Sequence, residues 1–126
     1  MKGNESIRLV VVDDVPDVAD TLTMQLQLDG YTVFTAYSST QAIPVIEEHC
    51  PDGVLFDISM PEIDGHELAT LIRHRYRNDL ILVAVTGSDE SQPRVSAAIR
   101  MADHCLRKPV DLAALRKLFP LRVSES

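Results

Sequence analysis

In four segments of the sequence, a carboxylate, hydroxyl or ammonium side chain follows a run of mostly apolar residues. Asp13 and Asp14 follow the first run, Asp57 the second and Thr86 the third, and Lys108 follows the short segment from His104 to Arg107. Three carboxylates that lie close together repel one another unless a cation joins them, and oxygen ligands of this kind suit Mg²⁺. A carboxylate bound to such an ion, beside an ammonium and a hydroxyl group, is a nucleophile prepared to accept a phosphoryl group. The predicted chemistry is therefore phosphoryl transfer onto Asp57.

The apolar runs have the composition of β-strands, and amphipathic helical patterns lie between them. Strands that are buried on both faces of a parallel sheet have nearly continuous apolar sequences. We expect strands over Ile7 to Val12, Tyr31 to Ala36, Val54 to Asp57, Leu80 to Val85 and His104 to Arg107. Tyr31 to Ala36 alternates and His104 to Arg107 is short, so both are expected at the edges of the sheet.

Five helices are expected from apolar residues at helical spacing and from signals at the helix ends. The first contains Pro16 and closes at Asp29 and Gly30, the second is capped by Ser38 or Ser39, and the third covers about His66 to Tyr76. The fourth carries Val95 to Ala102, and Asp111 caps the fifth. Pro44 should kink the second helix or delay its start.

Strands that alternate with helices predict an α/β protein with a doubly wound parallel sheet. The strand character fits the flavodoxin-like order 2-1-3-4-5. Ligands of such sheets bind outside the carboxyl ends of the strands. The five side chains named first would then meet at one rim.

Composition limits the class of protein. The chain has 126 residues and a net charge of −7, which argues against nucleic-acid or anionic membrane partners. No apolar run approaches the roughly 20 residues that span a bilayer. We expect one domain over residues 7–120, with tails at 1–6 and 121–126. Cys50 and Cys105 form no metal motif and are expected as reduced thiols of a cytoplasmic protein.

Each polar group also has a simpler structural explanation. Asp13 and Asp14 precede Pro16 and would favour a helix N-terminus. Thr86 could belong to an ordinary turn, and Lys108 could be a solvated lysine before Pro109. These separate explanations do not account for complementary groups ending different strands at one rim, which favours the functional interpretation.

Taken together, these residues resemble the receiver domain of two-component response regulators. The resemblance covers roughly residues 7–119. It depends on Asp13-Asp14, Asp57 with Met60-Pro61 and Asp64-Gly65, Thr86-Gly87, and Lys108-Pro109. It implies a signalling switch rather than an enzyme.

The resemblance assigns a role to each site residue. It implies that Asp14 and Asp57 bind Mg²⁺ directly, together with the backbone carbonyl of Ser59, while Asp13 assists through water. Thr86 would hydrogen-bond the phosphoryl oxygen and move on activation. Lys108 would pair with the phosphoryl group.

The resemblance also implies partners. The phosphoryl donor would be a phosphohistidine on a sensor histidine kinase or a histidine phosphotransfer protein. The stretches 60–68 and 108–115 look most like receivers attached to hybrid sensor kinases. Val15, Pro16 and Val18 or Ala19 on the first helix would offer apolar contact to the donor. A downstream effector would bind the face formed by the fourth helix, fifth strand and fifth helix.

Position 105 departs from the family pattern. Receivers often carry Tyr or Phe three residues before the lysine, where the ring swings inward as the threonine moves. Here that position is Cys105, which has no ring to gate a pocket. The usual coupling between threonine and aromatic ring is therefore not expected.

The four histidines, His49, His66, His74 and His104, show no ligand spacing and are expected at the surface or at helix ends.

Three other classes use related folds. A haloacid-dehalogenase type phosphatase has a second aspartate two residues after the nucleophile, where this chain has Ser59. A flavodoxin needs a first loop rich in Ser, Thr and Gly, whereas Asp13 and Asp14 would repel a phosphate. A non-phosphorylated module on the receiver fold is expected to lack an acid or the lysine, and all are present here.

Overall fold

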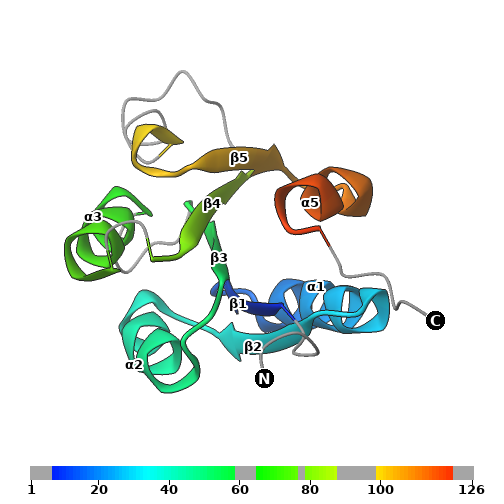
Figure 1. The fold of residues 1–126 in the computed structure, drawn as a ribbon, viewed down its shortest axis with the longest axis horizontal. Coiled ribbons are helices and arrows are strands. Elements are labelled where there is room, and N and C mark those ends of the chain that lie inside the picture. The colour runs from blue at the N-terminus through cyan, green and yellow to red at the C-terminus, as the bar shows by residue number, and fades with distance from the viewer. Residues whose placement is uncertain (1–6, 59–64, 77–78, 88–98, 121–126) are drawn as a thin grey trace.

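A single parallel sheet forms the centre of the molecule (Figure 1). The computed structural model describes residues 7–58, 65–76, 79–87 and 99–120. Five strands are hydrogen-bonded in the order β2-β1-β3-β4-β5, as the sequence predicted. They are β1 (Arg8–Val12), β2 (Thr32–Ala36), β3 (Gly53–Asp57), β4 (Ile81–Thr86) and β5 (His104–Arg107).

Helices cover both faces of the sheet. The elements are α1 (Pro16–Asp29), α2 (Ser39–His49), α3 (Gly65–Tyr76) and α5 (Leu112–Leu118). Helices α1 and α5 lie on one face, and α2 and α3 lie on the other (Figure 1). Residues 99–101 are helical, while most of the expected fourth helix falls on 88–98, outside the described residues. The predicted doubly wound fold is confirmed.

Alternation along the strands divides the core into two clusters. Successive side chains of a strand point to opposite faces of the sheet. Val10, Val54 and Leu82 belong to the cluster that includes Ile46 of α2 and Ile72 of α3; Leu9, Val11, Leu55 and Val83 belong to the cluster of the other face. Asp13 and Asp57 therefore continue the series that faces α1 and α5.

Most of the predicted helix ends are confirmed. Gly30 closes α1 with a φ of 115°, a left-handed conformation that glycine adopts without strain. The side chain of Ser38 accepts a hydrogen bond from the Gln41 backbone N–H, so Ser38 rather than Ser39 caps α2. The Asp111 side chain accepts from the Ala113 N–H at 3.0 Å.

Several boundaries differ from the prediction. Helix α2 begins at Ser39 and continues through Pro44, so Pro44 does not delay its start. Strand β3 begins at Gly53, one residue before the predicted start at Val54. Strands β2 and β4 begin one residue later than predicted. Tyr31 and Leu80, the predicted first residues, are buried by packing but lie outside the hydrogen-bonded strands.

Contacts beyond the sheet hold α5 against the end of α1. The Tyr31 hydroxyl donates to the Phe119 carbonyl oxygen at 2.6 Å. The Arg116 Nε donates to Asp29 Oδ2 at 2.7 Å. The Phe119 ring lies against the backbone of Gly53, where a Cβ would collide with it. These contacts hold α5 in place and thereby position the connection from Lys108 to Asp111.

Candidate functional site

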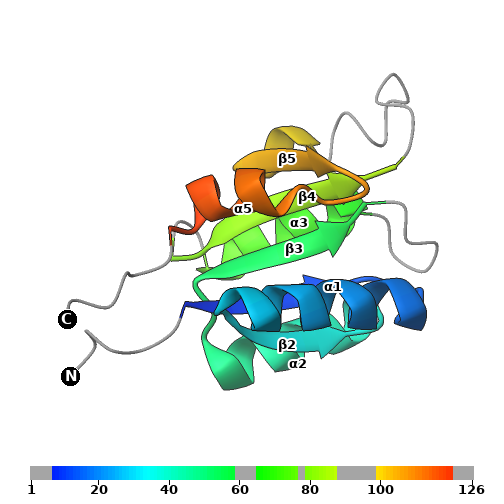
Figure 2. The same cartoon turned by 90° about the vertical axis from the view of Figure 1, so that its right-hand side faces the viewer.

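The strand register brings the polar strand ends to one rim. Val12 lies opposite Phe56, Asp57 opposite Val85, and Thr86 opposite Arg107. Because all strands run in one direction (Figure 2), the residues that follow them emerge together at the carboxyl edge. The juxtaposition predicted from the sequence is confirmed.

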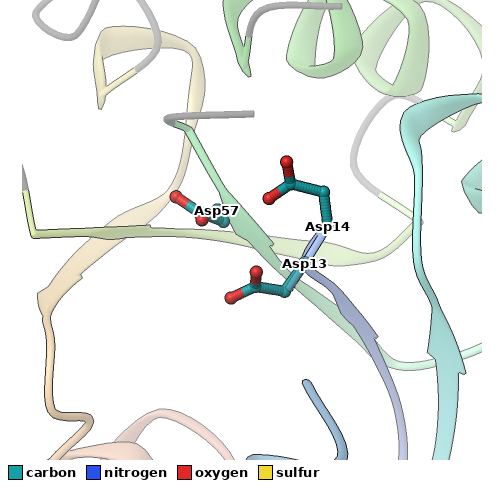
Figure 3. Close-up of side chains that lie close together, drawn as sticks. All are labelled: Asp13, Asp14 and Asp57. Carbon is teal, nitrogen blue, oxygen red and sulfur yellow. The ribbon is translucent and has the colours of Figure 1, made fainter. Parts of the chain in front are cut away.

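Three carboxylates form the centre of the rim (Figure 3). Asp13 and Asp14 come from the end of β1, and Asp57 is the last residue of β3. One carboxylate oxygen of each lies within 4.8 Å of one of each of the others. Asp13 and Asp57 are only 4% and 6% exposed, whereas Asp14 is half-buried. Buried carboxylates at this spacing require positive charge between or beside them.

Lys108 supplies positive charge to two of these acids. Its Nζ donates to Asp13 Oδ2 and to Asp57 Oδ2, each at 3.1 Å. Burial alone would lower the pKa of Lys108, but the hydrogen bonds and charges of Asp57 and Asp13 outweigh it and raise that pKa. The lysine is therefore held as an ammonium ion beside Asp57.

Asp13 and Asp14 occupy different environments although they are neighbours. Asp13 Oδ1 accepts from the Val15 N–H at 3.0 Å, and the Asp13 N–H donates to the Ala36 carbonyl at 3.1 Å. With Lys108 on its other oxygen, the Asp13 carboxylate is held on both sides. Asp14 is the more exposed acid and has room to approach a solvent cation.

Thr86 lies next to Lys108 in the structure. It is fully buried at the end of β4, and its carbonyl accepts from the Lys108 N–H at 3.0 Å. A change at one of these residues is therefore transmitted to the backbone of the other. Thr86, Lys108 and the three acids are the residues that the sequence predicted, and all five meet at the rim.

Other predicted residues have varied outcomes. Ser59, the expected backbone ligand, lies outside the described residues. Cys105 is half-buried and packs against the core cluster beneath α2 and α3, and it forms no disulfide with Cys50. Val15 and Val18 are 46% and 40% exposed, but Ala19 is fully buried. Of the predicted alternatives Val18 and Ala19, Val18 is the exposed one, and Ala19 is excluded as a contact residue because it faces the sheet.

The three histidines whose side chains the structure describes lie away from the rim. His49 ends α2 and stacks on Phe34 with ring centroids 3.6 Å apart. His74 is exposed on α3 and His104 is exposed at the start of β5. The side chain of His66 is outside the described residues. The three described histidines therefore take the surface or helix-end positions that were predicted.

One feature of the site, a groove, was not predicted from the sequence. A groove of about 570 Å³ opens beside Asp57 between α1 and the segment that follows β5. Thr21, Gln25 and Val110 line it together with strand residues. In the sequence, these positions look like ordinary helix surface or loop, so no sequence signal distinguishes the groove.

Comparison with known proteins identifies the family. The family described as response regulator receiver domain matches residues 9–119, nearly the whole chain. The chain belongs to the response regulator receiver domain family. This receiver domain is thus a member of a family of signalling switches in phosphoryl-accepting two-component systems.

A curated relative agrees with the assignment to the receiver domain family. Response regulator MprA of Mycobacterium ulcerans is 34% identical over 110 residues, which cover 87% of this chain and 47% of that protein. The receiver domain thus spans about half the length of this curated relative. In the part that the structure describes, no helix is long and apolar enough to cross a membrane.

Two solved structures are informative neighbours. Response regulator TrrA of Thermotoga maritima, in complex with Mg²⁺-BeF, is 30% identical with a TM-score of 0.77, covering 90% of this chain and 96% of that one. The second is from Saccharomyces cerevisiae, a complex of the histidine phosphotransfer protein Ypd1 with the receiver domain of Ssk1. It matches at 25% identity and a TM-score of 0.75, covering 90% of this chain and 86% of that one.

Proposed function

We propose that this receiver domain takes a phosphoryl group onto Asp57 from a phosphohistidine, in a Mg²⁺-dependent reaction, and that the transfer switches its binding to partners. The observation that carries the proposal is the pairing of Lys108 with Asp57 at 3.1 Å, beside two further carboxylates. An anionic oxygen held next to an ammonium group and open to a groove is suited to attack phosphorus.

The acids fit a hard divalent cation. Carboxylate oxygens from Asp13, Asp14 and Asp57 lie within 4.8 Å of one another, and Mg²⁺ prefers oxygen ligands. We assign Asp14 and Asp57 as direct ligands with the Ser59 carbonyl, and Asp13 as a ligand through water. When bound, the ion would offset the charge on the phosphoryl oxygens.

The side chains of the chain itself have distinct tasks. A carboxylate oxygen of Asp57 attacks phosphorus, and the Lys108 ammonium, already beside Asp57, pairs with a phosphoryl oxygen. The Thr86 hydroxyl donates a hydrogen bond to another phosphoryl oxygen. Because the Lys108 N–H is bonded to the Thr86 carbonyl, movement of the two is coupled.

The partners follow from the family and from the exposed surface. A phosphotransfer protein is bound by a receiver in the Ypd1–Ssk1 complex. In this chain, Val15 and Val18 expose apolar surface at the start of α1 next to the acids, and we assign the donor protein to that surface. We assign binding of a downstream effector to the face of the fourth helix, β5 and α5. Phosphorylation changes the affinity of the effector only if the effector binds the phosphorylated and unphosphorylated states differently.

Further proposals concern the domain boundaries, the cellular location and the class of protein to which the domain is attached. We assign residues 7–120 as the receiver domain, a cytoplasmic switch that assists its own phosphorylation without turning over other substrates. Residues 60–68 and 108–115 support attachment to a hybrid sensor kinase as the more specific class.

Intact mass after incubation with acetyl phosphate and Mg²⁺ tests the proposal. We expect the addition of one phosphoryl group, which is absent in Asp57→Ala and retained in the control Asp79→Ala, an exposed acid two residues before β4. Labelling that persists in Asp57→Ala would refute the assignment of the acceptor. Steady hydrolysis of many phosphate esters would instead support a phosphatase.

The donor surface is tested separately. Val15→Glu should slow transfer from the cognate phosphohistidine protein roughly 10-fold or more while leaving labelling by acetyl phosphate in place, since a charge buried in an apolar contact is unfavourable. Leu71→Glu on α3, also an exposed apolar residue, is the control. Unchanged protein-to-protein transfer in Val15→Glu would rule out docking at this surface.

A further inference from the structure

The groove beside Asp57 has the size and lining of a site for a small apolar group. Its volume is about 570 Å³, within the range of small-molecule pockets. It lies between α1 and residues 109–110. The side chains that matter here are Val18, Thr21 and Leu22 of α1, and Pro109 and Val110 after β5.

The floor of the groove leads directly to the acceptor. Val11, Leu55 and Val85 form the floor, one from each central strand. Asp57 follows Leu55 by two residues, so its side chain lies on the same face of the sheet. Asp57 and Lys108 therefore line the same groove as the apolar residues. A short chain attached to a phosphoryl group at Asp57 therefore has apolar surface available within the same groove.

We propose that this groove binds the acyl chain of a small acyl phosphate, so that the receiver takes its phosphoryl group from short apolar acyl phosphates in preference to acetyl phosphate. The inference rests on the proposed function of Asp57. The class is restricted further by Asp17, which lines the groove, as Asp13 does. Both carboxylates disfavour an acyl group that carries its own negative charge.

The transfer balances without another reactant. A carboxylate oxygen of Asp57 forms a bond to phosphorus, and the bond between phosphorus and the acyl oxygen breaks. The electron pair of that bond leaves with the oxygen, so the products are an aspartyl phosphate and the free carboxylate anion. The groove contacts only the chain and takes no part in the bond changes.

Rates with a matched donor series test the proposal. Labelling by acetyl, butyryl and succinyl phosphate is measured by intact mass over a range of donor concentrations with Mg²⁺ present. Acetate and butyrate are leaving groups of similar basicity, so a difference between their donors reports on the chain. Two added methylene groups that become buried should lower the half-saturating concentration of butyryl phosphate roughly 3- to 15-fold relative to acetyl phosphate. Succinyl phosphate should show no such gain.

Two variants on α1 separate the groove from the rest of the helix. Thr21→Phe places a ring in the groove and should bring the ratio of half-saturating concentrations for acetyl and butyryl phosphate close to one. Met24→Phe adds a ring to an exposed position of the same helix outside the groove and should keep the wild-type ratio.

A binding measurement gives a readout without transfer. In 2-oxopentylphosphonate, a methylene group replaces the bridging oxygen of butyryl phosphate, so no phosphoryl group can leave. It should shift the methyl resonances of Val18 and Val110 and leave those of Leu71 on α3 in place. Shifts at Leu71 comparable to those at Val18 would overturn the assignment of the groove.

The outcomes distinguish this inference from the proposed function. Labelling of Asp57 by all donors with equal half-saturating concentrations would overturn the inference, leave the groove to a protein partner and leave the proposed function intact. No labelling of Asp57 by any donor would overturn both.

Discussion

The Nζ of Lys108 lies 3.1 Å from Oδ2 of Asp57, although the two residues are 51 positions apart in the chain. The pairing places a fixed positive charge at the acceptor before any phosphoryl group arrives. A preorganised charge of this kind needs no reorganisation during the reaction.

Lys108→Met should slow labelling of Asp57 by acetyl phosphate roughly 100-fold, because it removes the ammonium group that pairs with the phosphoryl oxygen. The initial rate is measured by intact mass. Lys117→Met removes the same charge from the exposed side of α5 and should keep the rate within about 2-fold. Equal rates for both variants would show that Lys108 has no part in transfer.

Asp14→Asn should weaken Mg²⁺ binding more than tenfold, since Asp14 is the acid most open to a solvent cation and an amide is a poorer ligand than a carboxylate. Ligand binding to the folded state raises its stability. Millimolar Mg²⁺ should therefore raise the melting temperature of the wild type by a few degrees and that of Asp14→Asn much less. An identical rise in both proteins would place the ion elsewhere.

Phosphorylation should perturb Thr86 and its loop while the side chain of Cys105 keeps its rotamer. Cys105 is half-buried against the core and has no ring that could cover or open a surface pocket. Side-chain couplings of Cys105 with and without the phosphoryl analogue BeF₃⁻ measure this directly. A large, state-dependent change of the Cys105 rotamer would contradict the prediction.

Gly53→Ala should lower the free energy of unfolding by about 1–3 kcal/mol, because the added methyl group collides with the Phe119 ring. Urea denaturation gives the value. Gly87→Ala is the control: its nearest neighbours would be Lys108 side-chain carbons at 3.8 and 3.9 Å, an ordinary contact distance. Phe119→Leu should recover part of the loss in Gly53→Ala, and a loss unaffected by Phe119→Leu would assign it to another cause.

The pair of Arg116 and Asp29 should make stability depend on pH in the acid range. Hydrogen bonds from Arg116 hold the pKa of Asp29 below its usual value. The pair therefore stabilises the fold above the unfolded-state pKa of about 3.9, and the contribution is lost as pH falls through the lower folded-state pKa.

Urea denaturation of Arg116→Met across the acid range checks this linkage. The variant should be less stable than the wild type near neutral pH, and the difference should narrow as pH falls through the folded-state pKa of Asp29. Lys117→Met serves as the control for loss of one positive charge from α5. A difference that stays constant with pH would show that Arg116 acts through packing alone.

The strand order and the site residues could be predicted from sequence because both depend on local patterns. Continuous apolar runs such as that ending at Asp57 identify strands buried on two faces. Parallel strands then leave their polar ends at one edge. Helix ends were predictable at Gly30 and Asp111 for the same reason, since turn and capping chemistry involves only a few neighbouring residues.

Other features were not predictable because they depend on side chains from distant segments. The burial of Ala19 is set by the rotation of α1 on the sheet, which the sequence spacing left open. The inclusion of Gly53 in β3 depends on pairing with Leu9 and Ile81.

By itself, the sequence of this receiver domain determined which residues end each strand and which of them carry charge. Only the tertiary structure decided that Lys108 contacts Asp13 and Asp57, and that a groove opens beside them. The reason is physical: strand and cap signals act over a few residues, whereas a contact or a groove is set by how α1 and the segment after β5 pack across the same sheet.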